Sequence, residues 1–259
     1  MKDILEEIIV QKRLLIEEQK KIVSMEQLME NAEEETSRLS MREALLSSPT
    51  GIIAEFKRKS PSKGWIKEQA LAEEIIPAYE RNGAAALSIL TDQPFFGGSL
   101  KDIRTARPLV GIPILRKDFI IDEYQLFQAK VVEANAVLLI AAALTPERCA
   151  ELAACAHKLG LETLLEIHSE KELSYVGENI DMVGVNNRNL GTFHTDVENS
   201  FRLISQLPKD MVLVSESGIS SPDTMKRLRE AGFKGFLIGE NFMKTDNPGK
   251  ALKEFTAEF

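Results

Sequence analysis

The chain has 259 residues, of which 44% are hydrophobic and 28% charged, a composition typical of a globular protein with a sizeable core. Its formal net charge of -8 disfavours a protein that binds nucleic acid or anionic membranes, but it leaves small anionic ligands open. No apolar run approaches the roughly 18 to 20 residues of a membrane span, and the charged N-terminus lacks the apolar core of a signal peptide, which predicts a cytoplasmic protein.

The N-terminal residues 1–48 are charged and have a helical pattern, with Ile4, Ile8, Leu14 and Ile16 placed among Glu and Lys. They predict an amphipathic helical extension. The charged run EEIIVQKRLLIEEQKK within it is expected to form a solvated helix face.

From residue 52 onward, short runs rich in Val, Ile and Leu alternate with segments of helical period, which is typical of βα units around a parallel sheet. The segment 145–160 illustrates the helices, with Thr145 as N-cap and Gly160 as C-cap. HSEKELSYVGEN is too short for a long helix. Eight runs predict strands: IIAEF from Ile52, AALSIL from Ala85, PILRKDF from Pro113, AVLLIA from Ala136, ETLLEI from Glu162, DMVGVN from Asp181, MVLVSE from Met211 and GFLIG from Gly235.

Eight βα units of this size predict the α/β class and a (β/α)8 TIM barrel with an N-terminal helical extension. The alternative is a doubly wound open sheet. Against it, the first strand runs into KRKSPS and not into the glycine-rich turn of a dinucleotide-binding fold. No linker divides the chain, so we predict one domain over residues 1–259, of which 1–48 form the extension.

Polar side chains recur where the predicted strands end. Active sites of such barrels lie at the C-terminal ends of the strands, and the alternation of side chains selects the inward-facing residues there. Taken singly, each of these residues is explained as a solvated residue at a strand end. The convergence of so many charges at one barrel mouth favours a catalytic site. The six residues expected to converge are Glu55, Lys57, Lys117, Glu166, Asn186 and Glu216.

The loops after the last two strands predict a phosphate site. SESGIS follows the seventh strand and IGEN follows the eighth, and loops at these positions form the usual phosphate cradle of barrel enzymes. Gly218 and Gly239 allow close approach of the backbone, and Ser217 adds a hydroxyl donor.

Several other residues have two interpretations. His168 is either a proton carrier or a structural residue at the start of a loop. Phe95 and Phe96 form either loop core or a wall for an aromatic ligand. Arg116 and Asp118 face away from the mouth, so we expect them to pair with neighbours beneath the loops.

The cysteines, Cys149 and Cys155, lie on different helix faces, and the histidines lack zinc-site spacing, so no disulfide or metal site is expected.

Seven ordered blocks resemble the indole-3-glycerol phosphate synthase family: IIAEFKRKSPSKG, SILTDQPFFGGS, ILRKDFIIDEYQ, LLEIHSE, GVNNRNL, VSESGI and FLIGENFM. The resemblance spans the whole chain and implies the monofunctional form. It also implies ring closure of 1-(2-carboxyphenylamino)-1-deoxyribulose 5-phosphate, with loss of carbon dioxide and water, to indole-3-glycerol phosphate in tryptophan biosynthesis. It implies no cofactor and no metal.

By this resemblance, Lys117 matches the general acid that protonates the substrate's carbonyl oxygen. Glu166 matches the residue that transfers protons in the dehydration, and it needs a raised pKa if it acts as an acid near neutral pH. Lys57 matches the lysine that holds the substrate's carboxylate, and it is a second candidate for proton delivery. Glu55 orients Lys57.

The remaining matches are binding residues. Glu240 departs from the family, which often has a small residue such as serine there, so its carboxylate is expected to turn away and leave only its N–H for the phosphate. By resemblance, Asn186 positions the ring system, Arg188 and Glu216 surround the sugar hydroxyls, Ser60, Phe96, Leu237 and Ser217 contact the substrate, and Ser217, Gly218, Gly239 and Glu240 bind the phosphate.

Two rival functions remain. One is another phosphate-binding barrel, such as phosphoribosylanthranilate isomerase or the tryptophan synthase α subunit, and the other is a barrel that binds a sugar phosphate without catalysis. The loop KRKSPSKGWI is expected to close over the substrate, with Trp65, the single tryptophan, as a reporter. The only partner expected is the small-molecule substrate, with no nucleic acid or membrane, and a monomer is favoured.

Overall fold

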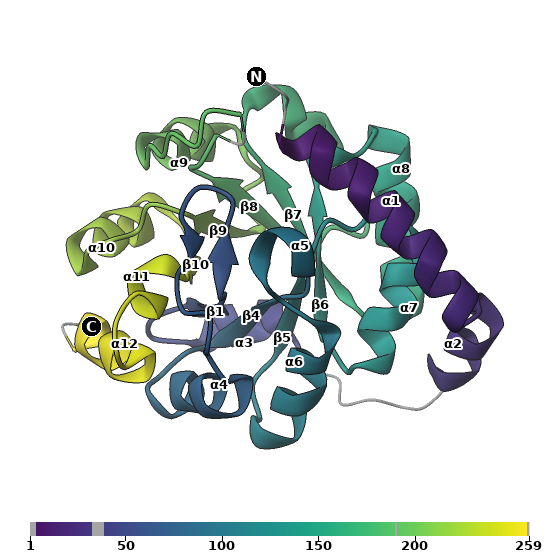
Figure 1. The fold of residues 1–259 in the computed structure, drawn as a ribbon. Coiled ribbons are helices and arrows are strands. Elements are labelled where there is room, and N and C mark those ends of the chain that lie inside the picture. The colour runs from purple at the N-terminus through teal and green to yellow at the C-terminus, as the bar shows by residue number, and fades with distance from the viewer. Residues whose placement is uncertain (1–3, 33–38, 190, 258) are drawn as a thin grey trace.

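Eight parallel strands form a closed barrel in the order β1-β10-β9-β8-β7-β6-β5-β4. The computed structural model describes residues 4–32, 39–189, 191–257 and 259 (Figure 1). The closed order excludes the open sheet, and the predicted (β/α)8 barrel is confirmed. The strands are β1 (Ile52–Phe56), β4 (Ala86–Leu90), β5 (Ile114–Lys117), β6 (Ala136–Ile140), β7 (Glu162–Ile167), β8 (Met182–Asn186), β9 (Val212–Glu216) and β10 (Gly235–Ile238), so all eight predicted runs contain one.

Helices surround the strands (Figure 1). The Thr145 hydroxyl accepts a hydrogen bond from the Arg148 N–H at the start of α8, as predicted, and Gly160 follows that helix with a φ of 73°. The outer helices are α4 (Ala72–Arg81), α6 (Leu100–Ala106), α7 (Glu123–Val131), α8 (Pro146–Lys158), α9 (Glu198–Leu203), α10 (Pro222–Ala231) and α12 (Pro248–Thr256).

Shorter elements occupy the loops. After β7 the chain forms only the 3-10 helix η3, which agrees with the expectation that HSEKELSYVGEN is too short for a long helix. These elements are the hairpin of β2 (Lys59–Ser60) and β3 (Gly64–Trp65), the helices α5 (Gln93–Phe96) and α11 (Glu240–Met243), and the 3-10 helices η1 (Arg107–Leu109), η2 (Ala141–Ala143), η3 (Glu170–Tyr175) and η4 (Ile204–Gln206).

The core has two layers that follow the alternation of side chains along the strands. Ile53, Leu115 and Leu164 belong to the cluster inside the barrel. Ile52 and Ala54 belong to a second cluster between the strands and the outer helices. Because successive side chains point to opposite faces, the polar residue two positions after an inward apolar residue also points inward. This rule directs the strand-end side chains into the barrel mouth.

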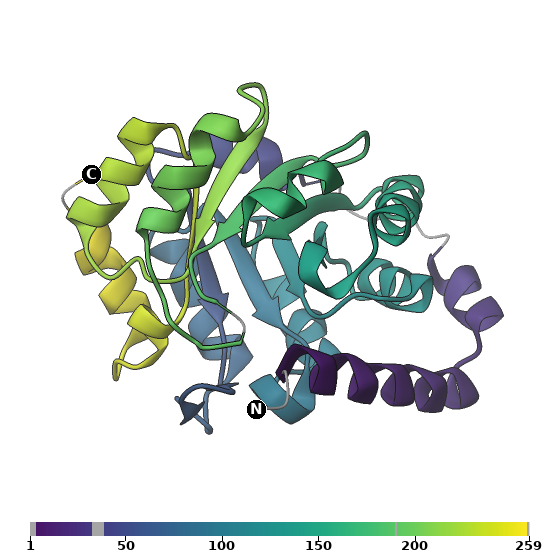
Figure 2. The ribbon, with the colours of Figure 1, turned by 90° about the horizontal axis from the view of Figure 1, so that it is seen from above.

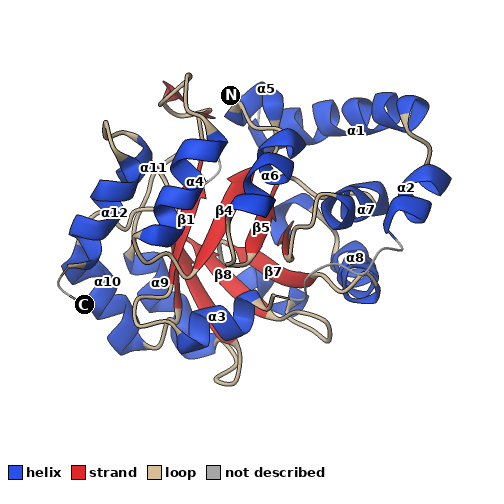
Figure 3. Cartoon of the chain, turned by 90° about the horizontal axis from the view of Figure 1, so that it is seen from below, coloured by secondary structure: helices blue, strands red, loops and turns tan. Residues whose placement is uncertain are grey.

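The N-terminal extension lies at both ends of the barrel. Helix α1 lies at the end that carries the β2–β3 hairpin (Figure 2), and α3 lies at the opposite end (Figure 3). Met41 and Leu45 of α3 pack against the cluster inside the barrel, and the Ser40 hydroxyl donates to Glu162 Oε1 at the start of β7 at 2.5 Å. The helices are α1 (Ile4–Ile22), α2 (Met25–Ala32) and α3 (Met41–Ser47).

The predicted helical extension is therefore present, although residues 1–3 and 33–38 lie outside the described part of the chain. The expectation that the charged run forms a solvated face is wrong at Lys12. This side chain is buried together with Ile8 and Ile16 of α1. Periodicity alone could not show that a lysine on the inner face meets carboxylates from the barrel loops.

Candidate active site

One cavity of about 540 Å³ opens at the C-terminal ends of the strands. Every residue predicted for catalysis or binding lines it. These residues are Glu55, Lys57, Ser60, Phe96, Lys117, Glu166, Asn186, Arg188, Glu216, Ser217, Gly218, Leu237, Gly239 and Glu240. The strand-end alternation thus brings together residues that are spread over most of the chain.

Lys117 lies between two carboxylates at the end of β5. Its ammonium donates to Glu166 Oε2 and to Glu216 Oε2, each at 3.1 Å. Burial disfavours the charge on Lys117, but attraction by Glu166, Glu216 and Glu55 outweighs burial and raises the pKa of the ammonium above its usual value. Lys117 is therefore charged at neutral pH, as a general acid must be.

The two carboxylates differ in their pKa. Burial disfavours the charge on Glu166, but Lys117, His168 and a hydrogen bond from Asn186 outweigh it and lower the pKa of Glu166 below its usual value. The raised pKa that an acid at position 166 would need is thus absent. In Glu216, burial and the neighbouring charge of Glu166 outweigh Lys117 and raise the pKa to about 7. Glu166 is the ionised partner of the pair.

The raised pKa of Glu216 should make the stability of the protein depend on pH. Between the ordinary glutamate pKa of 4.5 and about 7, the folded protein holds a proton that the unfolded chain releases, so the free energy of unfolding falls as the pH rises through this window. Glu216→Gln removes this proton. Between about pH 5 and about pH 8, we expect the free energy of urea unfolding to fall by about 1 to 3 kcal/mol more in wild type than in Glu216→Gln.

Glu73→Gln is the matched control, because Glu73 is an exposed glutamate on α4. This variant should keep the pH dependence of wild type. Parallel curves for wild type and Glu216→Gln would contradict the raised pKa.

Glu55 and Lys57 form a second pair at the end of β1. Lys57 Nζ lies 2.5 Å from Glu55 Oε1. Both side chains are largely buried, so each needs the other's charge. A Cβ atom at Gly239 would clash with Glu55 Oε1, so the glycine at this position makes room for the carboxylate. A larger residue at position 239 would thus displace Glu55.

Gly184 is a site residue that sequence reasoning missed. It lies inside β8, and a Cβ atom on it would clash with Glu216 Oε1. The only signal in the sequence is a glycine within an apolar strand, which marks either a bulge or the close approach of another group. Here the approaching group is the carboxylate of Glu216.

The loop after β9, which is predicted to bind the phosphate, makes a tight turn. Ser217 and Gly218 both have positive φ, 67° and 78°. A left-handed serine costs about 1 kcal/mol, and such strain clusters at functional sites. The Asn187 side chain supports the turn by donating to the Ser217 carbonyl at 3.0 Å. A Cβ atom at Gly218 would lie 2.7 Å from Thr195 Cγ2, so only glycine fits there.

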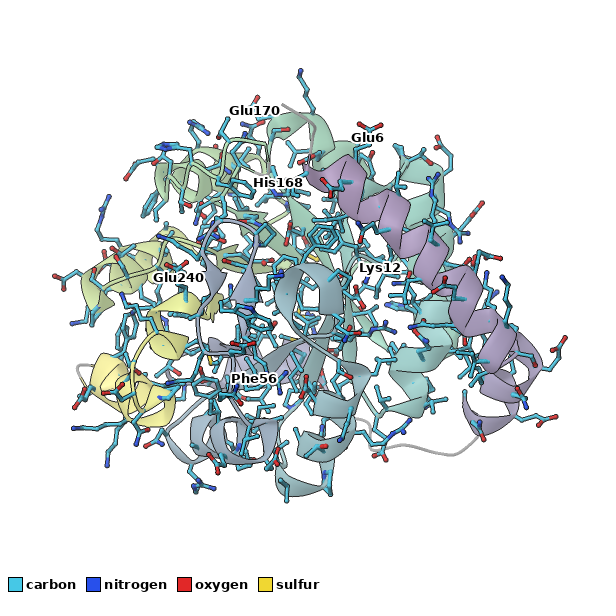
Figure 4. All side chains as sticks on the ribbon, viewed as in Figure 1. Glu6, Lys12, Phe56, His168, Glu170 and Glu240 are labelled. Carbon is cyan, nitrogen blue, oxygen red and sulfur yellow. The ribbon has the colours of Figure 1, made fainter. Side chains whose placement is uncertain are left out.

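Glu240, labelled in Figure 4, pairs with cations from two other loops at the barrel mouth. Its Oε2 lies 3.4 Å from Arg188 Nη2, and its Oε1 lies 3.8 Å from Lys63 Nζ. Arg188 also donates to the Ser62 hydroxyl at 3.2 Å, so it links the β1–α4 loop to the loop after β8. The carboxylate therefore pairs with two cations of the cavity lining instead of pointing away from them.

An apolar wall lines the other side of the cavity. Phe95 and Phe96 both pack against the cluster inside the barrel, and Phe96 also lines the cavity. The rings of Phe96 and Phe119 lie 6.0 Å apart. Sequence reasoning missed most of this wall, which also includes Ile4, Leu5, Ile8, Leu90, Phe119, Leu138 and Ile140.

His168, labelled in Figure 4, lies beside Glu166 and is not among the residues that line the cavity. Its Nε2 lies 3.4 Å from Glu166 Oε1, and its Nδ1 lies 4.0 Å from Glu172 Oε2. Within the described residues, neither ring nitrogen has a hydrogen-bond partner. This position is compatible with either a proton carrier or a structural role.

Two features are absent from the part of the chain that the structure describes. It contains no cluster of three or more His, Cys, Asp or Glu residues that could hold a metal ion. No described helix is long and apolar enough to cross a membrane.

Comparison with solved structures shows the fold. Thiamine phosphate pyrophosphorylase from Pyrococcus furiosus has a TM-score of 0.60 and 16% identity, with 84% of this chain and 96% of that chain covered. Tryptophan synthase subunit alpha from Legionella pneumophila has a TM-score of 0.60 and 15% identity, with 83% and 94% covered. At these identities the similarity is one of barrel architecture.

Comparison of sequences is more specific. A family model described as indole-3-glycerol phosphate synthase matches residues 5–255. The indole-3-glycerol phosphate synthase of Bacteroides thetaiotaomicron is 68% identical over 255 residues, which cover 98% of each chain. That of Salinibacter ruber is 45% identical over 258 residues, covering 98% of this chain and 96% of the relative.

Proposed function

The chain belongs to the indole-3-glycerol phosphate synthase family, and we propose that the cavity at its barrel mouth binds 1-(2-carboxyphenylamino)-1-deoxyribulose 5-phosphate. The enzyme is a decarboxylating lyase of tryptophan biosynthesis that closes the indole ring and releases carbon dioxide and water. One observation carries the assignment of the cavity: the buried ammonium of Lys117 is held between Glu166 and Glu216 at its base.

The lining of the cavity supports one orientation of the substrate. The phosphate lies at the backbone N–H groups of Ser217–Gly218 and Gly239–Glu240, and the aromatic ring lies against the apolar wall that includes Phe96. The ring carboxylate meets Lys57, which pairs with Glu55 in the free protein. The ketose carbonyl then lies between these ends, next to Lys117.

Lys117 acts first, in the condensation. The ring carbon that bears the carboxylate attacks the ketose carbonyl, and Lys117 gives a proton to the carbonyl oxygen, which becomes a hydroxyl group. Loss of carbon dioxide then returns its bonding electrons to the ring and restores aromaticity. Its charged state in a buried site allows Lys117 to stabilise the developing alkoxide.

Glu166 acts in the dehydration that follows. The hydroxyl leaves as water with a proton, for which Lys57 is the candidate donor, and the neighbouring ring CH2 group loses a proton to complete the indole. The lowered pKa of Glu166 keeps it ionised and able to accept that proton. Asn186 holds Glu166 in place through its side-chain hydrogen bond.

A fluorescence assay tests this proposal directly. The purified protein is mixed with the carboxyphenylamino-deoxyribulose phosphate without added metal, indole formation is followed continuously, and the assay is repeated with a chelator. Turnover that survives the chelator supports a cofactor-free synthase. Saturable quenching of Trp65 without turnover would instead favour a barrel that only binds the sugar phosphate.

The same proposal includes a monomer in the cytoplasm. A phosphorylated biosynthetic intermediate as substrate supports a cytoplasmic location.

Glu240 should weaken the binding of the substrate's phosphate. Its carboxylate repels the phosphate and competes with it for Arg188 and Lys63. Glu240→Ser should lower the KM by about three- to tenfold, and the gain should shrink at high salt, because the site is partly exposed to solvent. Steady-state kinetics at low and high ionic strength measure both effects.

Glu240→Gln separates the effect of charge from that of size and should reproduce most of the decrease. A KM that is unchanged or higher in both variants would mean that Glu240 orders Arg188 for the substrate and does not oppose the phosphate.

A further inference from the structure

Lys12, labelled in Figure 4, is the one buried charged residue of α1. It connects this helix to two loops of the barrel mouth. The side chain is only 3% exposed. Its ammonium lies 2.6 Å from Asp92 Oδ2 and 2.7 Å from Asp118 Oδ1. Two contacts this short and this buried fix the helix much more closely than a surface ion pair does.

Asp92 connects Lys12 to the apolar wall of the cavity. This residue follows β4 and caps the N-terminus of α5, because its Oδ1 accepts the Phe95 N–H at 2.9 Å. The short helix α5 carries Phe96, which lines the cavity. The position of Lys12 therefore bears directly on the position of Phe96.

Asp118 connects Lys12 to the catalytic strand end. It directly follows Lys117, and its Oδ1 accepts the Phe119 N–H at 2.8 Å. Its Oδ2 accepts hydrogen bonds from the Thr91 hydroxyl at 2.6 Å and from Arg116 Nη2 at 3.0 Å, which confirms the predicted pairing. The prediction that Asp118 faces away from the mouth is wrong, because Asp118 also lines the cavity. Lys117 and Phe119, the chain neighbours of Asp118, thus both line the cavity.

The charges of this network balance only when Lys12 is present. Asp92 and Asp118 face Lys12 and Arg116, and all four side chains are nearly inaccessible to solvent. Within the described residues, Lys12 is the only cation at ion-pair distance from Asp92. The attraction of the two carboxylates outweighs burial and raises the pKa of Lys12, which keeps it charged.

The residues of α1 that line the cavity lie on the same helix face as Lys12. Ile8 precedes it by one turn and Ile4 by two, and Leu5 lies beside them. Because a helix is rigid over this length, the anchor at Lys12 determines how these three side chains cover the mouth.

We propose that Lys12 is a positioning residue for the reaction, which holds the apolar face of α1 and the loops bearing Phe96 and Phe119 in one arrangement around the substrate's aromatic ring. This inference rests on the proposed function of the cavity. It assigns to the N-terminal helix a defined part in substrate affinity, through one buried ion-pair network.

Lys12→Met tests the proposal, because it keeps the length of the side chain and removes its charge. We expect the KM to rise by about tenfold, together with a smaller loss of kcat. The decisive measurement is competitive inhibition by two small probes. Inhibition by 2-aminobenzoate, which has the aromatic ring and its carboxylate, should weaken by about tenfold, whereas inhibition by inorganic phosphate should stay within about twofold.

Lys20→Met is the matched control. Lys20 also lies on α1 and pairs with a carboxylate of the barrel, Asp122 at 2.9 Å, but it is partly exposed and does not line the cavity. This variant should leave both inhibition constants and the KM within about twofold of wild type. Ile8→Ala keeps the ion pairs and should reproduce the selective loss of 2-aminobenzoate affinity.

The outcomes separate the possible explanations. Equal weakening of both probes in Lys12→Met would indicate general loosening of the barrel and overturn the proposal, as would unchanged inhibition by 2-aminobenzoate. If Lys12→Met does not fold, Asp92→Asn is the second variant. It removes one of the two carboxylate charges beside Lys12, keeps the ion pair between Lys12 and Asp118, and should likewise weaken inhibition by 2-aminobenzoate selectively. Wild-type turnover tests the function of the cavity separately, so failure of that function is distinguishable from failure of the role of Lys12.

Discussion

Replacing Lys117 by alanine should reduce kcat by a factor on the order of 10³ to 10⁵ and leave the barrel folded. The variant lacks the ammonium that we propose as the proton donor to the carbonyl oxygen. It also removes the cation that Glu166 and Glu216 share, so the pKa of Glu216 should rise further and the remaining charge of Glu166 opposes the binding of an anionic substrate. Indole fluorescence measures turnover, and circular dichroism with urea unfolding measures the fold.

Lys101→Ala, at an exposed lysine of α6, controls for the loss of a positive charge and should keep wild-type kinetics. Lys117→Met fills the space of the missing side chain, so it separates the loss of the proton donor from the loss of packing. Activity of either Lys117 variant near that of wild type would rule out Lys117 as the general acid.

Replacing Glu166 by glutamine should separate carbon dioxide release from indole formation. The ring closes and decarboxylates through Lys117, but the dehydration lacks its proton acceptor, so kcat for indole should fall by a factor of about 10² to 10⁴. In a single turnover, the variant should release carbon dioxide at a rate near that of wild type and accumulate a non-fluorescent hydroxylated intermediate. Trapped carbon dioxide and indole fluorescence, measured in parallel, report the two stages.

Lys117→Ala is the natural comparison, because it should lose both signals together. If Glu166→Gln also lost both signals in proportion, Glu166 would act before or during the condensation, and the division of roles between these two residues would be wrong.

The barrel and most of the polar residues at its mouth could be predicted, because both depend on the alternation of side chains along each strand. A strand such as IIAEF has to be buried, and the residues two positions after an inward Ile53 or Leu164 have to point toward the mouth. Glu55 and Glu166 therefore follow from the sequence as inward-facing residues. Their protonation does not, because the pKa depends on how many charges meet at one point, and this number is set by residues from other strands.

The contribution of α1 could not be predicted for the same reason. A helical pattern identifies an inner face, but it does not show that Lys12 on that face meets Asp92 and Asp118, which lie far away in the sequence. Glu240 is similar, since its two partners come from two other loops. Sequence reasoning predicted Glu240 as a residue of the phosphate site but missed its pairing with both cations.

The glycines of β8 and of the loop after β10 also limit how this barrel can be redesigned. Gly184 leaves space for Glu216, and Gly239 leaves space for Glu55, because a methyl group at either glycine would overlap the carboxylate beside it. Each glycine and its glutamate therefore form a size-matched pair. Mutant libraries that vary only the glycine or only the glutamate of a pair will contain mostly inactive proteins. Libraries that replace the glutamate by a shorter acid when they enlarge the glycine preserve the volume of the cavity.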